Sequence, residues 1–492
     1  MFKTITPEQA GISSKKVKKF LSKLNERGLC MHSVLMMRGD EIFTECYWKP
    51  FHKDFRHRMY SQTKSFVGVA IGLLEEDGKL SLNDKIASYF PEKIDRELPE
   101  YLKNLTIKDM LTMETAGEPP FWLLNEDAID RVRWYFNTND STHPGGTFWK
   151  YDSEGSQVLS VLVEKLSGMT LFDFLKLRLF DKFGTFTTAY TLKTRNDDTF
   201  GDSSMMCTTR DMASFARFVM NYGTWKGDRL LNEEYLKTAT SPVVDNNITG
   251  FNGYSSDGYG YQIWGSEKGF AFHGMGGQFT ICVPEKDFIF TCTGDNQGLN
   301  WSGALTFTYV YDLIVDNLSD SPLEKDDESY KELCEYEDSL ELRHLDGRKN
   351  NPFSEEINGR TFVCEENPMG ISKFSLHFTK DDEGEFHYTN AQGDKILPFG
   401  LCKNVFCKFP QLGYSDIHAG IKTTNGFMYD CAVSAAWKED KKLLMNVQII
   451  DKYFGNFSTI FSFKEDTAVV RMEKHAEVFL EEYNGFLVAH SK

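Results

Sequence analysis

The chain has 492 residues, enough for two to four domains of about 150 residues, so a single small module is excluded. Its 72 acidic and 55 basic residues leave a net charge of −17, which argues against binding to nucleic acid or to an anionic membrane surface. Hydrophobic residues make up 41% and aromatic residues 14%, which is too apolar for a disordered chain.

The sequence shows no sign of export or of membrane insertion. Its N-terminal segment has no apolar core of the kind that marks a secretory signal, and the most apolar run, 66–74, is about half the length of a bilayer span. The ten cysteines form no CxxC pair and are too sparse for a disulfide scaffold, so we expect reduced thiols. We therefore predict a cytoplasmic protein that does not bind membranes.

Up to about residue 320 the pattern predicts a sheet flanked by helices. Residues 33–47 read as two β runs separated by a Gly-Asp pair, which is typical of a hairpin. Apolar residues in 66–74 recur every three or four positions, which predicts a helix over 61–76. The later β runs are expected to join the hairpin in one sheet. Further helices are predicted over 107–113, 154–167 and 209–221, and further strands over 259–293.

The C-terminal part of the chain has a different pattern. An acidic, polar segment over 321–352 is predicted to be a connector that can be helical in part. Beyond it, about eight short runs alternate apolar and polar residues between turn residues, which is typical of a small antiparallel barrel or sandwich. The predicted organisation is a first domain over 1–320, the connector over 321–352 and a β domain over 353–492.

Ser61 and Lys64 lie three residues apart at the start of a predicted helix, so both project from one face with Cβ atoms about 5–6 Å apart. A serine hydroxyl needs an adjacent base to become nucleophilic, and a desolvated lysine can serve as that base. Free N–H groups at the helix N-terminus can also stabilise an oxyanion beside Ser61. The alternative is that this S-x-x-K is a chance pair on a helix surface.

Two further features follow in order along the chain. A turn-rich loop, 143–153, delivers Tyr151 directly before the helix predicted at 154. His273 ends a β run and is followed by glycines, which allow the backbone to approach a ligand closely. Taken alone, Tyr151 is a packing residue and His273 a loop histidine. Their order behind Ser61 and Lys64 favours a functional interpretation.

These three motifs carry a resemblance to a known superfamily. Ser61-Gln-Thr-Lys64, the Pro144-Gly-Gly-Thr-Phe-Trp-Lys-Tyr151 segment and His273-Gly occur in the order found in serine β-lactamases and penicillin-binding proteins. Over about residues 5–315 the chain resembles the β-lactamase-related branch, which holds class C enzymes, D-aminopeptidases, D-Ala carboxypeptidases and carboxylesterases. The resemblance implies an α/β (α+β) fold with an antiparallel sheet, flanking helices and a helical subdomain. From about residue 357 the chain resembles an appended lipocalin-like β-barrel domain.

The resemblance also implies a role for each motif residue. Ser61 is expected to be the acyl-forming nucleophile, Lys64 its proton partner, and Tyr151 the group that passes the proton toward the leaving group. His273 falls where relatives carry a basic residue, and a cation there would attract a substrate carboxylate. The N–H groups of Ser61 and Gly276 are expected to form the oxyanion hole.

Two positions in the expected substrate-binding set depart from the superfamily pattern. Ser153 stands where many relatives have an asparagine that holds a substrate amide, and Gly274 stands where they have a hydroxyl residue. Both changes remove groups that are expected to bind a β-lactam. We therefore predict a serine hydrolase acting on small esters or amides, of carboxylesterase, D-amino-acid peptidase or D-Ala carboxypeptidase type, with weak β-lactamase activity at most.

The main alternative is a catalytically silent relative that serves as a binding or scaffold protein. The eleven histidines are dispersed without H-E-x-x-H spacing, so we expect no metal and no cofactor. A small ester, amide or peptide substrate is the only expected partner, and the sequence leaves the oligomeric state open. The β domain either encloses a ligand or rests against its neighbour, and the second is favoured because no distinctive ligand residues are present.

Overall fold

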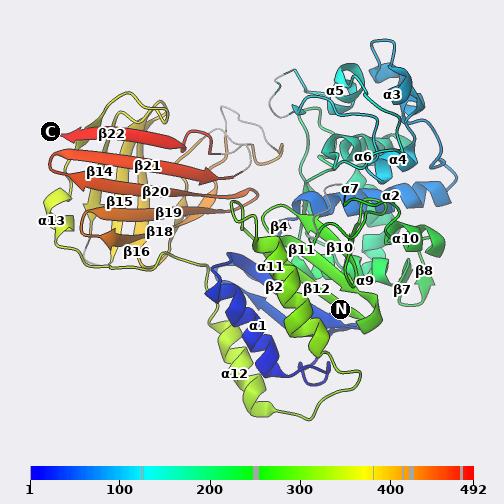
Figure 1. Cartoon of the computed structure of the whole chain (residues 1–492), viewed down its shortest axis with the longest axis horizontal. Helices are drawn as coiled ribbons and strands as arrows, with labels where there is room; N and C mark the ends of the chain where they lie inside the picture. Colours follow the sequence, from blue (N-terminus) through cyan, green and yellow to red (C-terminus); the bar gives the residue numbers. More distant parts are fainter. Residues whose placement is uncertain are drawn as a thin grey trace. The chain divides into compact units, whose positions relative to one another are not determined.

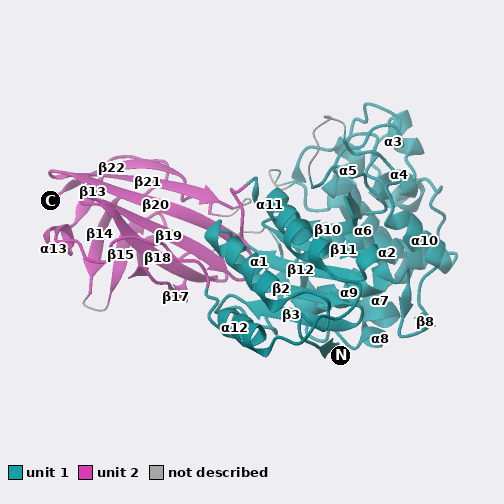
Figure 2. Ribbon diagram, turned by 60° about the horizontal axis from the view of Figure 1, so that its bottom comes forward, with its two compact units in different colours: residues 1–294, 300–341, 417–419 teal, residues 295–299, 342–416, 420–492 magenta. Residues whose placement is uncertain are grey.

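The computed structural model describes residues 2–122, 125, 127–247, 254–379, 382–412, 415–419, 426–476 and 480–492. Its internal contacts divide the chain into two compact units (Figure 2). The first contains residues 1–294, 300–341 and 417–419, and the second contains 295–299, 342–416 and 420–492. The domain boundaries predicted at 320 and 353 stay predictions.

A seven-stranded sheet lies at the centre of the first unit, with the order β1-β3-β2-β12-β11-β10-β9 among the described residues (Figure 1). The hairpin predicted over 33–47 is β2 and β3, and β2 pairs antiparallel with β12. The predicted union of the hairpin with the later strands in one sheet is therefore confirmed. The strands are β1 (Lys3–Thr4), β2 (Met31–Arg38), β3 (Glu41–Tyr47), β9 (Trp264–Ser266), β10 (Gly269–Gly274), β11 (Gln278–Val283) and β12 (Phe288–Gly294).

Helices cover both faces of this sheet, and its strands are therefore buried on both sides (Figure 1). Alternate residues of one strand enter different cores: Leu35 and Met37 of β2 face the core shared with α2 and α9, whereas Val34 and Met36 face α1 and α11. The helices of this unit are α1 (Ser14–Glu26), α2 (Thr63–Glu76), α3 (Glu100–Asn104), α4 (Ile107–Leu111), α5 (Arg131–Thr138), α6 (Ser153–Ser167), α7 (Leu171–Leu175), α8 (Asp181–Phe183), α9 (Thr209–Met220), α10 (Glu233–Ala239), α11 (Ser302–Tyr309) and α12 (Asp327–Asp338). Short strands β4 (His57–Arg58), β5 (Tyr190–Thr191), β6 (Met205–Cys207), β7 (Thr224–Trp225) and β8 (Asp228–Arg229) lie between them.

The predicted helices over 107–113, 154–167 and 209–221 correspond to α4, α6 and α9, and local capping sets their ends. Gly168 ends α6 with a φ of +73°, and Thr208 caps α9 by accepting a hydrogen bond from the Asp211 N–H. The strand expected from residue 259 begins later, at Trp264. The chain before it turns tightly against α10, where a Cβ added at Gly260 would lie 2.0 Å from the Ala239 carbonyl oxygen.

The second unit is a closed barrel, which decides between the barrel and the sandwich. Ten strands are described in this unit, and nine of them form the ring, which closes where Gly400 and Leu401 of β16 pair with β18. Aromatic side chains pack inside, and the hydroxyls of Tyr388 and Tyr483 lie 2.9 Å apart. The elements are α13 (Phe353–Ile357), β13 (Phe362–Cys364), β14 (Lys373–Phe378), β15 (Glu383–Asn390), β16 (Gly393–Leu401), β17 (Val405–Lys408), β18 (Asp430–Glu439), β19 (Lys442–Ile450), β20 (Phe454–Lys464), β21 (Thr467–His475) and β22 (Gly485–Ser491).

The acidic segment 321–352 contains helix α12, which packs against α1 within the first unit (Figure 1). Leu333 of α12 is buried in the core that α1 shares with the sheet, and Lys18 of α1 forms an ion pair with Glu332 at 3.0 Å. Within the described residues, no helix combines the length and the apolar character that crossing a bilayer requires. All ten cysteines are free thiols.

Candidate active site

Ser61 lies in a single 3-10 turn, Tyr60–Gln62, that leads directly into α2. The turn is strained, since Tyr60 has a φ of +48°. The Arg58 guanidinium lies 4.5 Å from the centre of the Tyr60 ring, and the Thr63 hydroxyl donates to the Tyr60 carbonyl at 2.6 Å. Met205 on β6 closes the arrangement, because its N–H donates to the Thr63 hydroxyl at 2.9 Å. These contacts hold Ser61 half-exposed among buried neighbours.

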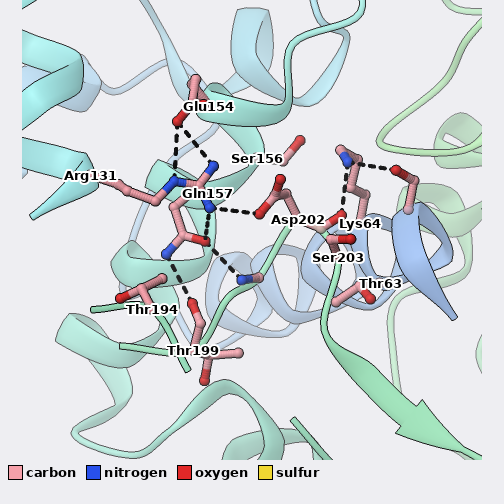
Figure 3. Close-up of polar contacts among 12 residues, drawn as sticks. Thr63, Lys64, Arg131, Glu154, Ser156, Gln157, Thr194, Thr199, Asp202 and Ser203 are labelled. Atoms are coloured by element: carbon pink, nitrogen blue, oxygen red, sulfur yellow. Dashed lines mark hydrogen bonds and ion pairs between the residues drawn. The ribbon is translucent and has the colours of Figure 1, made fainter. Parts of the chain in front are cut away.

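Lys64 follows Ser61 by three residues and is the second residue of α2. Its side chain points back to Ser61. The Nζ atom donates to Ser61 Oγ at 2.9 Å and to the backbone carbonyl of Asp202 at 2.8 Å (Figure 3). Lys64 is only 2% exposed, so little water competes for these bonds. The structure thus brings the two residues of the S-x-x-K motif into direct contact.

Tyr151 and His273 belong to a row of stacked rings beside Lys64. The Tyr151 ring centre lies 5.0 Å from Lys64 Nζ. Tyr151 stacks on Trp264 with ring centres 5.4 Å apart, and Trp264 stacks on His273 at 4.9 Å and 8° between the planes. The row connects the second and third motifs through Trp264, the first residue of β9.

The charge state of His273 differs from the one the resemblance implies. Burial lowers the pKa of His273 to about 3, so the imidazole is neutral at neutral pH. Its Nε2 atom is buried and has no hydrogen-bond partner among the described residues. The expected cation is therefore wrong for His273, because the apolar rings around it disfavour the charged form.

Gly274 and Gly276 follow His273 at the end of β10 and in the turn to β11. A Cβ added at Gly274 would lie 2.3 Å from the carbonyl oxygen of Met59, so only glycine lets β10 approach the segment before Ser61 this closely. Gly276 has a φ of +80°, which favours glycine. The oxyanion hole from the N–H groups of Ser61 and Gly276 stays a prediction.

Ser153 is the first residue of α6 and is half-buried. The carboxylate of Asp152, directly before it, caps the helix by accepting from the Gly155 N–H at 2.9 Å. Burial raises the pKa of Asp152 to about 6 and that of Glu154 to about 7. The substrate-binding role of Ser153 stays a prediction.

Sequence reasoning missed four residues that the structure places around the motifs: Trp264, Asp202, Arg131 and Glu154. Trp264 lies within the span 5–315 over which the chain resembles the β-lactamase-related branch, so a signal for it was present. The other three lie in no recognisable motif and meet only in the folded chain (Figure 3). In the part of the chain that the structure describes, no three His, Cys, Asp or Glu side chains are arranged to hold a metal ion.

The sequence profile of the Beta-lactamase family matches residues 19–311. The chain is 24% identical over 258 residues to the 6-aminohexanoate-dimer hydrolase of Paenarthrobacter ureafaciens. The aligned region covers 49% of this chain and 66% of that protein's own length. The match thus leaves about a third of that relative unaligned.

Two solved structures share the fold. A Bacillus anthracis protein assigned as a 6-aminohexanoate-dimer hydrolase superposes with a TM-score of 0.51 at 17% identity, over 64% of this chain and 86% of that one. EstCE1, described as a hydrolase with promiscuous acyltransferase activity, superposes with a TM-score of 0.50 at 13% identity, over 61% and 98%. Together with the seven-stranded sheet, its flanking helices and the barrel described above, these likenesses confirm the predicted fold class.

Proposed function

Because this chain belongs to the beta-lactamase family of hydrolases, we propose that it is a serine hydrolase that works through an acyl-enzyme on Ser61. The observation that carries the proposal is the 2.9 Å contact between Ser61 Oγ and Lys64 Nζ at the head of α2. At this distance Lys64 Nζ can take the Oγ proton, which is the activation that a serine nucleophile needs. The Tyr151 ring centre lies 5.0 Å from Lys64 Nζ, and its hydroxyl is the second group that we assign to proton transfer.

In acylation, the Ser61 Oγ proton moves to Lys64 Nζ while Oγ bonds to the substrate carbonyl carbon. The carbonyl oxygen becomes an oxyanion that the N–H groups of Ser61 and Gly276 stabilise. The bond between carbon and leaving group then breaks as Tyr151 gives its hydroxyl proton to the leaving group and regains one from Lys64. Water releases the acyl group by the reverse path, so the residues end as they began.

We propose small esters or amides as substrates, of carboxylesterase, D-amino-acid peptidase or D-Ala carboxypeptidase type. The neutral His273 offers no charge to a substrate carboxylate, and Ser153 is shorter than the asparagine it replaces. The hydrolase names of the Paenarthrobacter relative, a 6-aminohexanoate-dimer hydrolase, and of EstCE1 support hydrolysis of a small substrate. We expect nitrocefin, a β-lactam, to be hydrolysed at least about tenfold less efficiently in kcat/KM than the best p-nitrophenyl ester. A cytoplasmic location stays a prediction.

A covalent adduct tests the proposal directly. The protein is incubated with a fluorophosphonate, and the intact mass and the modified peptide are measured. We expect one adduct, on Ser61, that is absent from Ser61→Ala. A folded wild-type protein that gains no adduct and cleaves no ester would instead support the catalytically silent alternative.

A further inference from the structure

Asp202 contacts the candidate active site and a buried ion network at the same time. Its backbone carbonyl accepts a hydrogen bond from Lys64 Nζ at 2.8 Å, and its side-chain Oδ1 accepts one from Arg131 Nη1 at 2.9 Å (Figure 3). The position of the carbonyl that holds Lys64 is therefore tied to the position of Arg131.

Arg131 is held rigidly at the start of α5. Its side chain is 1% exposed and binds Glu154 Oε2 through Nη2 at 3.0 Å and through Nε at 3.2 Å. The guanidinium also lies over the rings of Trp122, at 4.4 Å, and Phe200, at 5.0 Å. Burial opposes its charge, but the carboxylates of Asp202 and Glu154 outweigh burial and raise the pKa of Arg131. Arg131 is therefore a charged and immobile donor.

The backbone on either side of Asp202 is fixed as well. Gln157 of α6 accepts from the Gly201 N–H at 2.8 Å and donates to the Thr199 carbonyl at 2.9 Å (Figure 3). Arg58 donates to the Ser203 carbonyl at 2.8 Å. The backbone at Gly201 packs directly against α6, since a Cβ added at Gly201 would lie 2.1 Å from the Ser160 side chain.

A buried ion network of this kind adds little to the stability of a fold, because the desolvation of its charges offsets most of the attraction between them. It is effective at fixing geometry, because the forked guanidinium specifies direction as well as distance. We infer that Arg131, acting through the side chain of Asp202, is a positioning residue that aligns Lys64 for proton transfer with Ser61. The inference rests on the proposed serine-hydrolase function.

The test compares three variants of the full chain with wild type. Asp202→Ala removes the side-chain link but keeps the carbonyl that accepts from Lys64, and it leaves Arg131 its two hydrogen bonds to Glu154. Asp202→Asn keeps an oxygen that can accept from Arg131. Arg131→Lys keeps the charge but loses the forked geometry.

Arg217→Lys is the matched control. Arg217 on α9 is also largely buried, at 11% side-chain exposure, and also binds two carboxylates, those of Asp40 and Asp287. These carboxylates lie in the β2–β3 and β11–β12 turns, about 20 Å along the sheet from the turn after His273, since β11 separates the two ends.

We measure kcat and KM on a p-nitrophenyl ester and the rate of fluorophosphonate adduct formation on Ser61. We expect Asp202→Ala and Arg131→Lys to lower kcat and the adduct rate at least about tenfold with KM within about twofold, because misalignment affects the reacting atoms and not substrate binding. Asp202→Asn should recover most of the loss, and Arg217→Lys should stay within twofold of wild type.

The outcomes separate this inference from the function on which it rests. If folded Asp202→Ala and Arg131→Lys keep wild-type kcat and adduct rate, or if Arg217→Lys loses as much as they do, the positioning role is overturned while the serine-hydrolase function stands. If wild-type protein forms no Ser61 adduct, the proposed function itself fails. Circular dichroism and thermal unfolding of each variant establish that folded proteins are compared.

Discussion

At the scale of single residues, the contact of Lys64 Nζ with Ser61 Oγ at 2.9 Å allows proton transfer without any side-chain movement. We therefore expect Ser61→Ala to abolish hydrolysis of short-chain p-nitrophenyl esters. Lys64→Ala and Tyr151→Phe should each lower kcat at least about a hundredfold, the usual effect of losing a general acid or base. Steady-state kinetics check these values, and wild-type activity in Ser61→Ala would contradict the nucleophile assignment.

His273 gives a pH-dependent contribution to stability whose sign follows from its lowered pKa. The folded protein keeps the imidazole neutral down to about pH 3, whereas the unfolded chain binds a proton below about pH 6.5. The stabilisation is therefore complete above about pH 6.5 and is lost as the pH falls toward 3. Between pH 7.5 and pH 5 the loss amounts to about 2 kcal/mol.

His273→Gln isolates this contribution from that of other buried groups. We expect the difference in unfolding free energy between wild type and His273→Gln to shrink by about 2 kcal/mol on going from pH 7.5 to pH 5. Urea unfolding at the two pH values measures it. A difference that stays constant with pH would mean that the folded protein protonates His273 as readily as the unfolded chain does.

The sequence could identify the residues of the candidate site that lie in local motifs. The spacing of Ser61 and Lys64 fixes their proximity within one helical turn, and this contact is present. The neighbourhood of Asp202 could not be predicted, because its two contacts reach 138 residues back to Lys64 and 71 back to Arg131. The charge of His273 was misjudged for a different reason: residue spacing alone does not show that Trp264 stacks on its ring and that Phe279 packs edge-on against it.

At the scale of elements, the contact between β10 and the turn before α2 depends on Gly274. Gly274→Ala would place a Cβ 2.3 Å from the Met59 carbonyl oxygen, and backbone atoms would have to move. We expect the variant to lose about 1–3 kcal/mol of unfolding free energy. It should also lower kcat, because the strand that carries His273 is pushed away from Ser61.

Gly78→Ala is the control for this prediction. Gly78 ends the turn after α2 with a φ of +66° and open space around it, so the change adds backbone strain of about 1 kcal/mol without a clash. We expect kcat of this variant to match wild type. Equal losses of kcat in the two variants would show that general destabilisation, and not the β10 contact, limits activity.

At the scale of the whole molecule, strand alternation in the C-terminal sequence sufficed to predict a small β domain. It did not decide between a barrel and a sandwich, because closure depends on the short pairing of β16 with β18, which are not adjacent in sequence. Similarly, acidic composition predicted a connector over 321–352. Composition could not reveal that α12 buries Leu333 in the core it shares with α1.

The packing of α12 on α1 sets where the first unit can be separated from the barrel. We expect a fragment of residues 1–341 to fold and to keep Ser61 acylation, because all three motifs precede residue 280 and the unit retains its cores. A fragment of residues 1–320 lacks α12 and exposes the apolar surface that covers Leu333, so its Tm should be several degrees lower. Thermal unfolding and fluorophosphonate labelling of both fragments measure these effects.

If the 1–341 fragment is folded by circular dichroism yet fails to form the Ser61 adduct, the barrel contributes to the active site. Equal Tm values for the two fragments would show that α12 adds nothing to the first unit.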